Sequence, residues 1–132
     1  MDENSTQTNI PETEARGAPF QERVQSWVLD CFGSDIAGDR AERNRRFLEE
    51  SLELVQALGF TRDSAHQLVE YVFNRPKGEP EQELGGVMVT LASLCETNGL
   101  DMAAEGEAEL ARINSPDVLV KIRARNAAKP AF

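Results

Sequence analysis

The chain has 132 residues and a formal net charge of -9, and 40% of its residues are hydrophobic and 28% charged. This length and composition predict one globular domain with one core. No apolar run reaches the roughly 20 residues that a transmembrane helix needs, so we expect no membrane partner. The acidic excess excludes a surface that binds nucleic acid nonspecifically, because such a surface needs clustered Lys and Arg. Free nucleotides stay compatible, since magnesium can bridge their phosphates to carboxylates.

Residues 1–18 are rich in Asn, Thr and Glu and contain almost no large apolar side chain. Such a composition cannot offset the entropy lost on ordering, so residues 1–18 are predicted to be a disordered tail and residues 19–132 a single helical domain. No basic stretch followed by an apolar stretch opens the sequence, so no secretory signal is expected. Cys31 and Cys95 are interpreted as buried reduced thiols, and a cytoplasmic location is predicted.

The first helix is predicted after this tail, from apolar residues that recur at i, i+4, i+7, i+8 and i+11. It begins at Phe20, includes Cys31, and ends at Gly33. Residues 35–39, which include a glycine, are predicted to be a loop.

Two further helices are predicted from caps and apolar stripes in the middle of the chain. Asp39 can cap a long helix that runs to Leu58, with Gly59 at its C-terminal end. Thr61 is the expected N-cap of the next helix, which continues to about Asn74.

The last three predicted helices follow a Pro- and Gly-containing loop. One covers residues 80–98 and is apolar enough that we expect it to be deeply buried. Shorter helices follow over residues 101–113 and from residue 115 through residue 122. No strand pattern competes with this assignment, so the predicted fold is all-α, a helical bundle of four core helices plus short C-terminal helices.

An acidic strip, defined here as Glu49, Glu50 and Glu53, lies within the apolar stripe of the second helix. Residues three and four apart share a helix face, so these carboxylates gather on one strip and repel one another. A solvated acidic face is the ordinary interpretation. The flanking apolar residues instead favour a strip that borders the buried seam, where a divalent metal held by oxygen ligands would compensate the charge.

A second acidic element begins the fourth long helix, where Glu83 precedes the pair Gly85 and Gly86. Each glycine inside a helix costs about 1 kcal/mol relative to Ala, which predicts close approach of another helix or of a ligand. A bundle could therefore present Glu83 and the acidic strip from two facing helices to one shared cation.

These two elements resemble the motifs of the MazG-like all-α nucleoside triphosphate pyrophosphohydrolase superfamily, EExxE on one helix and ExxD at the start of another. The run Glu49-Glu50-Ser51-Leu52-Glu53 matches the first motif in full. The run Glu83-Leu84-Gly85-Gly86 matches the second except that Gly86 stands where the family has Asp. The resemblance covers roughly residues 20–105.

The resemblance implies magnesium-dependent hydrolysis of a (deoxy)nucleoside triphosphate to the monophosphate and pyrophosphate, as in house-cleaning of the nucleotide pool. Glu50, Glu53 and Glu83 would be metal ligands for Mg²⁺, for which Mn²⁺ could substitute. Glu49 would complete the metal shell or orient the attacking water, so Glu49 and Glu50 are the expected catalytic residues. The resemblance also implies a homodimer or homotetramer, which agrees with apolar stripes that exceed what one thin bundle can cover.

Two other functions stay open at this point. Gly86 in place of Asp favours a catalytically impaired homologue that acts as a nucleotide-binding or helical interaction protein. A phosphoribosyl-ATP pyrophosphohydrolase shares the same ancestry.

The remaining candidates have ordinary structural interpretations. Lys121 and Arg125 can oppose the dipole of the last helix or, alternatively, bind the substrate triphosphate. The arginines at 43, 45 and 46 could pair with the acidic strip or with phosphate. His66 is expected on the surface, and Trp27 is expected to pack rather than stack on a base.

Overall fold

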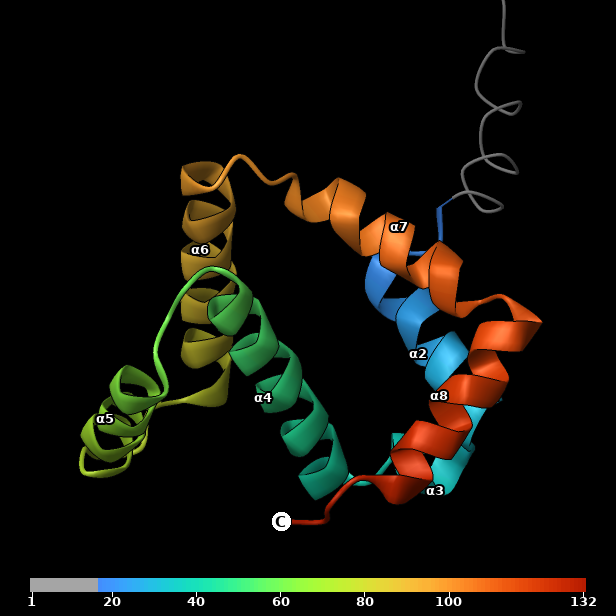
Figure 1. Cartoon of the computed structure of the whole chain (residues 1–132), viewed down its shortest axis with the longest axis horizontal. Coiled ribbons are helices and arrows are strands. Elements are labelled where there is room, and N and C mark those ends of the chain that lie inside the picture. The colour runs from blue at the N-terminus through green and yellow to red at the C-terminus, as the bar shows by residue number, and fades with distance from the viewer. Residues whose placement is uncertain (1–16) are drawn as a thin grey trace, which may run out of the picture. The chain divides into compact units, whose positions relative to one another are not determined.

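The computed structural model describes residues 17–132, which form helices α2 to α8 and contain no strand (Figure 1). The prediction of an all-α fold is confirmed, while the packing of four core helices into a bundle stays a prediction. Sixteen residues of the predicted tail, 1–16, lie outside the described residues. No helix within residues 17–132 combines the length and apolar character that crossing a bilayer requires.

The helices belong to two compact units. The first unit contains α2 (Phe20–Phe32), α3 (Ser34–Ala37), α8 (Pro116–Ala128) and the end of α7 (Met102–Ile113). The second unit contains α4 (Arg40–Ala57) from its second residue onward, α5 (Arg62–Phe73), α6 (Pro80–Thr97) and the beginning of α7. The expectation that residues 19–132 form a single domain stays a prediction.

Side-chain caps begin three helices at the positions that the sequence predicts. The Thr61 hydroxyl accepts a hydrogen bond from the Ser64 backbone N–H at 3.2 Å, and Asp101 Oδ1 accepts one from Ala104 at 3.0 Å. Ser115 caps α8 in the same way. Each cap satisfies a backbone donor that the first helical turn leaves without an intrahelical partner.

Glycines in the left-handed region end α4 and α6. Gly59 has φ 90°, and the following Phe60 N–H donates to the Val55 carbonyl at 2.9 Å. Gly99 has φ 66°, and Leu100 donates to Cys95 with the same geometry. This six-to-one bond is the Schellman motif, which needs a positive φ that glycine adopts without strain.

The structure corrects the predicted loop at residues 35–39. Ser34–Ala37 form the short helix α3, because the Gly33 carbonyl accepts from the Ala37 N–H at 3.1 Å and the Ala37 side chain is buried. Gly38 ends this turn rather than forming an open loop. The last helix also continues beyond residue 122, to Ala128.

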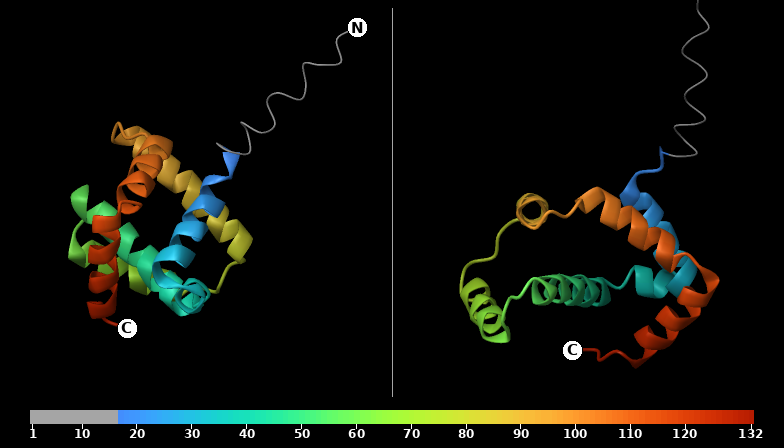
Figure 2. Two further views of the ribbon diagram at one scale, coloured as in Figure 1. Left: turned by 90° about the vertical axis from the view of Figure 1, so that its right-hand side faces the viewer. Right: turned by 45° about the horizontal axis from the view of Figure 1, so that its top comes forward.

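The core of the first unit lies where α2 packs against α3 and α8 (Figure 2). Its buried side chains are Val28, Cys31, Ala37 and Leu110. Trp27 packs edge-on against Phe32, and its indole N–H donates to the Ile113 carbonyl at 3.0 Å. The packing role expected for Trp27 is therefore confirmed.

Arg123 joins α8 to the C-terminal end of α2. Its Nε donates to the Cys31 carbonyl at 2.8 Å, and its Nη2 donates to the Asp30 carbonyl at 3.1 Å. These carbonyls belong to the last turn of α2, where backbone acceptors lack intrahelical donors and the helix dipole favours a positive charge. The guanidinium group therefore supplies both missing hydrogen bonds and a favourable charge.

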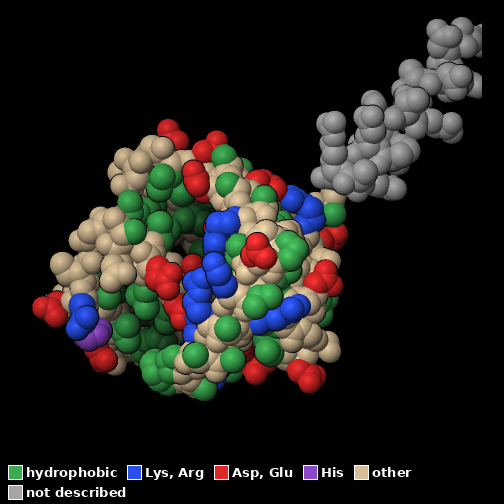
Figure 3. Space-filling model, turned by 45° about the vertical axis from the view of Figure 1, so that its right-hand side comes forward, with side chains coloured by type: hydrophobic (Ala, Val, Ile, Leu, Met, Phe, Trp, Pro, Cys, Tyr) green, Lys and Arg blue, Asp and Glu red, His purple; other side chains and the backbone are tan. Residues whose placement is uncertain are grey.

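The second unit leaves most of its apolar side chains exposed. Cys95 is its one buried hydrophobic residue within Ala41–Ala108, so the prediction that residues 80–98 form a deeply buried helix is wrong for the isolated chain. The reason is that no other helix of the unit packs extensively on α6. Apolar side chains are accordingly visible among the surface atoms in Figure 3.

Replacing Arg123 should destabilise the first unit selectively. We expect Arg123→Gln to lower the free energy of unfolding by about 1–2 kcal/mol, because two carbonyls at the end of α2 lose a charged donor. Urea denaturation followed by the fluorescence of Trp27, the one tryptophan of the chain, measures this directly. Arg125→Gln is the matched control, since this residue lies exposed on the same helix. Equal stability of the two variants would contradict the capping role.

Candidate functional site

The acidic strip lies on α4, in the continuous helix that the sequence predicts. Glu53 follows Glu49 and Glu50 by one helical turn, so the three carboxylates share one face. Glu50 and Glu53 are exposed, and the Glu49 side chain retains 31% of its accessible surface. The strip is thus open to solvent and to a ligand rather than sealed in a core.

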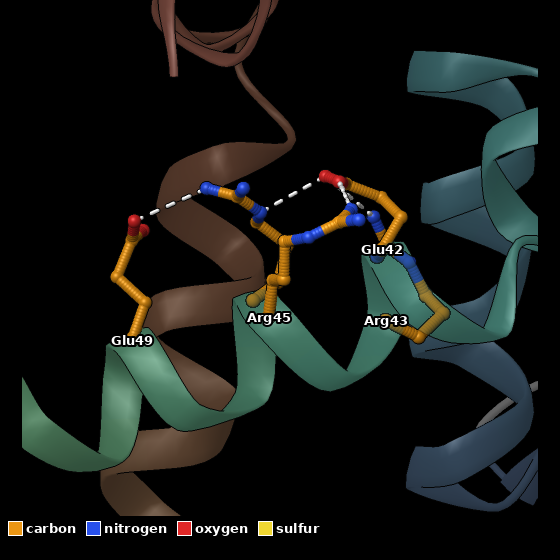
Figure 4. Close-up of polar contacts among 5 residues, drawn as sticks. Glu42, Arg43, Arg45 and Glu49 are labelled. Atoms are coloured by element: carbon orange, nitrogen blue, oxygen red, sulfur yellow. Dashed lines mark hydrogen bonds and ion pairs between the residues drawn. The ribbon is translucent and has the colours of Figure 1, made fainter. Parts of the chain in front are cut away.

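One turn before the strip, α4 carries a charged cluster that we call the arginine cluster, made of Glu42, Arg43, Arg45 and Arg46 (Figure 4). Arg45 Nη1 donates to Glu42 Oε2 at 3.1 Å, and Arg43 Nη2 lies 3.9 Å from Glu42 Oε1. Three positive side chains therefore approach the single carboxylate of Glu42.

Arg46 links the arginine cluster to the acidic strip. Its Nε lies 2.9 Å from Glu42 Oε1, an ion pair whose alignment is too poor for a hydrogen bond. Its Nη1 donates to Glu49 Oε2 at 3.1 Å. One guanidinium thus bridges two carboxylates, and it lowers the repulsion that Glu49 exerts within the acidic strip.

Glu83 lies in the first turn of α6 with its carboxylate folded back onto the preceding loop. A Cβ atom at Gly78 would collide with that carboxylate, so glycine at this position permits the close approach. The collision would involve the end of a flexible side chain, so Glu83 can rotate away without moving the helix. Its present orientation is one of several that a ligand could select.

The glycine pair on α6 has open space beside it. Among residues 17–132, a Cβ atom at Gly85 or Gly86 would meet no atom within 4 Å, so no neighbour in this part of the chain explains why glycine occupies these two helical positions. Thr90, on the same face one turn later, donates its hydroxyl to the Gly86 carbonyl at 2.8 Å. The Thr90 hydroxyl proton is therefore committed to the helix backbone, while the oxygen lone pairs remain available as acceptors.

The carboxylates of the acidic strip match what a hard divalent cation requires, because Mg²⁺ prefers oxygen ligands and retains several waters. Within residues 17–132 no group of three or more His, Cys, Asp or Glu side chains is placed to hold a metal ion. The assembly of Glu83 with Glu50 and Glu53 into one site stays a prediction. The donor types fit a magnesium site, and a shared arrangement would require α6, on which no other helix packs extensively, to approach α4.

The basic residues of α8 have two different environments. Lys121 and Arg125, the predicted substrate-binding residues, are exposed on the helix. Arg123 between them is the residue with the interhelical role, and no local spacing predicts it because its acceptors lie 92 and 93 positions away. The link between Arg46 and Glu42 is not among the sequence predictions either, although their i, i+4 spacing is a usable signal.

Other titratable groups have local roles. His66 is exposed, as expected, and both cysteines are free and buried. A hydrogen bond from Arg112 lowers the pKa of the Glu109 carboxyl, with a smaller contribution from the positive charge of the same residue. This exposed pair on α7 contributes little to stability because water screens it.

Comparisons with protein-family models, with curated proteins and with solved structures give no match. The resemblance to the MazG-like superfamily therefore rests on the motif residues of α4 and α6 alone.

Proposed function

We propose that the chain is a magnesium-dependent nucleoside triphosphate pyrophosphohydrolase that releases pyrophosphate and a monophosphate. The observation that carries this proposal is the acidic strip, three solvent-accessible carboxylates in the EExxE spacing on one face of a single helix. Support comes from Glu83, which occupies the early turns of a second helix as the family pattern requires. The substrate class and the house-cleaning role follow from the same resemblance, and the cytoplasmic location is proposed from the two free cysteines.

In this proposal the carboxylates have separate roles. Glu50 and Glu53, which are exposed and one turn apart, bind the cation, and Glu83 would join them once α6 approaches α4. Glu49 orients the attacking water and accepts its proton, and the bond from Arg46 holds Glu49 in position. Bound magnesium would neutralise the phosphates and stabilise the charge that develops during phosphoryl transfer.

We further propose that a second copy of the chain covers the exposed apolar faces of the second unit, as a homodimer or as part of a homotetramer. The exposed side chains of α4, α5 and α6 include Phe47, Leu48, Leu52, Leu68, Val72, Phe73, Leu84, Met88 and Val89. Together, over three helices, they expose on the order of 1,000 Å² of apolar surface, a total comparable with one side of a standard interface, about 800 Å². A second copy is the partner available to every chain, and most soluble oligomers are symmetric homo-oligomers.

A second candidate is an impaired homologue that binds nucleotides or another helical protein without hydrolysis. Gly86 favours this alternative, because the position that carries Asp in the family has no side chain here. This alternative is supported by the open space beside Gly86, where no side chain of residues 17–132 lies within 4 Å of an added Cβ atom.

The hydrolase proposal predicts that pyrophosphate release depends on both the metal and Glu53. The native chain should release pyrophosphate from at least one substrate in a panel of NTPs, dNTPs and phosphoribosyl-ATP, and only with Mg²⁺ or Mn²⁺. Glu53→Ala should reduce kcat/KM about 100-fold or more, because a ligand to the cation that stabilises the transition state is lost. Glu70→Ala, which removes an exposed carboxylate of α5, is the control and should retain full activity. Metal-independent release, or no release from any substrate, would reject the hydrolase.

A substitution at Gly86 tests whether α6 contributes to a shared metal site. Gly86→Asp should tighten Mn²⁺ binding about tenfold, because the open space beside Gly86 accommodates the carboxylate that the family motif contains. Titration followed by electron paramagnetic resonance measures free Mn²⁺ directly. Gly85→Asp is the control, since it adds the same charge one position away. Equal affinities of the native chain and both variants would mean that α6 does not contribute to a shared metal site.

A further inference from the structure

The arginine cluster has the composition of an anion site that one of the chain's own carboxylates occupies. Three guanidinium groups approach Glu42, and the nearest nitrogens of Arg45 and Arg46 lie 3.1 and 2.9 Å from its oxygens. A guanidinium group carries five N–H donors in a planar fork that matches carboxylates and phosphates. One carboxylate has too few acceptor positions for so many donors.

Arg43 is the member of this cluster whose hydrogen-bonding capacity is least used. Its Nε and Nη2 are buried and have no hydrogen-bond partner, and its closest carboxylate contact is 3.9 Å from Glu42. Buried donors that lack an acceptor are costly, so an acceptor-rich ligand would be favoured there. The Arg43 side chain as a whole keeps 29% of its surface accessible, so a ligand can contact its exposed part and would reach Nε and Nη2 once the side chain turns outward.

The cluster and the acidic strip occupy one charged stripe of α4. Arg46, Glu50 and Glu53 follow one another at i, i+4 and i+7, which places them on the same face of the helix. Arg43 and Glu50 share that face at i and i+7. One helical turn, about 5.4 Å of rise, separates Arg46 from Glu50, and about two turns separate Arg43 from Glu50.

We propose that Arg43 and Arg46 form a phosphate subsite for the pyrophosphate part of the substrate, and that Glu42 fills this subsite in the free protein. The inference rests on the proposed function, since it places the departing phosphates about one to two turns from the metal ligands. A pyrophosphate group carries more negative charge and more acceptor oxygens than one carboxylate, so it competes with Glu42 for both guanidinium groups. Arg45 keeps its bond to Glu42 and holds the displaced carboxylate nearby.

The competing explanation is that these contacts only support the helix. Pairs of Glu and Arg at i, i+3 and i, i+4 stabilise helices weakly, and such a role requires no ligand. The two explanations differ at Glu42. Neutralising Glu42 weakens the helix in either case, but it strengthens anion binding only if Glu42 competes with an anion for the arginines.

Calorimetric titration with inorganic pyrophosphate, in the presence of a chelator that removes Mg²⁺, distinguishes them. Glu42→Gln should bind pyrophosphate about tenfold more tightly than the native chain, and the double variant Arg43→Gln, Arg46→Gln about tenfold or more weakly, because charge-assisted hydrogen bonds are gained or lost. Arg40→Gln is the matched control. It removes the same charge from α4 but from outside the cluster, and it should bind as the native chain does.

Circular dichroism of each variant shows whether its helices still fold. If the double variant does not fold, the pyrophosphate affinities of Glu42→Gln and Arg40→Gln alone test the subsite. Equal affinities of these two single variants, or no binding by either, would overturn the subsite. Arginine-dependent pyrophosphate binding by a chain that hydrolyses no nucleotide would support the subsite and reject only the hydrolase. If the double variant hydrolyses the substrate with the same KM as the native chain, and pyrophosphate inhibits both equally, the subsite is rejected and the hydrolase proposal still stands.

Discussion

The two faces of α4 require opposite surroundings, and the proposed chemistry depends on how both are provided. One face carries the arginine cluster and the acidic strip, whose charges need water, counter-charges or a bound cation. The other face carries Phe47, Leu48 and Leu52, each more than two-fifths exposed in the single chain. A helix with this distribution is stable only when its apolar face is covered and its charged face remains accessible to ligands.

The apolar side chains of α5 and α6 also need to be covered. Association with a second copy is therefore linked, in this account, to formation of the proposed metal site. A partner that covers Leu68, Phe73 and Met88 would give the second unit a hydrophobic core and hold its helices in place. In the single chain these side chains are exposed and form no core. The glycine pair Gly85 and Gly86 fits this view, because open space beside a helix allows close approach by another chain. An ordered second unit would also limit where the Glu83 carboxylate can lie relative to the strip.

Local signals in the sequence predicted local structure well. Thr61, Ser115 and Gly59 mark helix ends because their side chains or φ angles act within a few residues. The role of Arg123 depends on packing between segments 92 and 93 positions apart, which spacing alone does not contain. The short helix α3 depends on the burial of Ala37, which the sequence pattern did not indicate. The apolar sequence of α6 predicts more burial than the structure shows. Such a sequence indicates that the helix must pack against something, but not whether the packing partner is the same chain. For the site, the sequence predicted the strip and its helix, whereas the approach of Glu83 depends on tertiary arrangement.

The most direct test of this dependence on association is sedimentation velocity of the full chain over a wide range of concentrations, with far-ultraviolet circular dichroism at each concentration. A reversible dimer or tetramer should form, and helix content should fall on dilution as the apolar faces of α4, α5 and α6 lose their cover. A chain that stays monomeric and fully helical at every concentration would contradict the claim that a second copy completes the unit that carries the site.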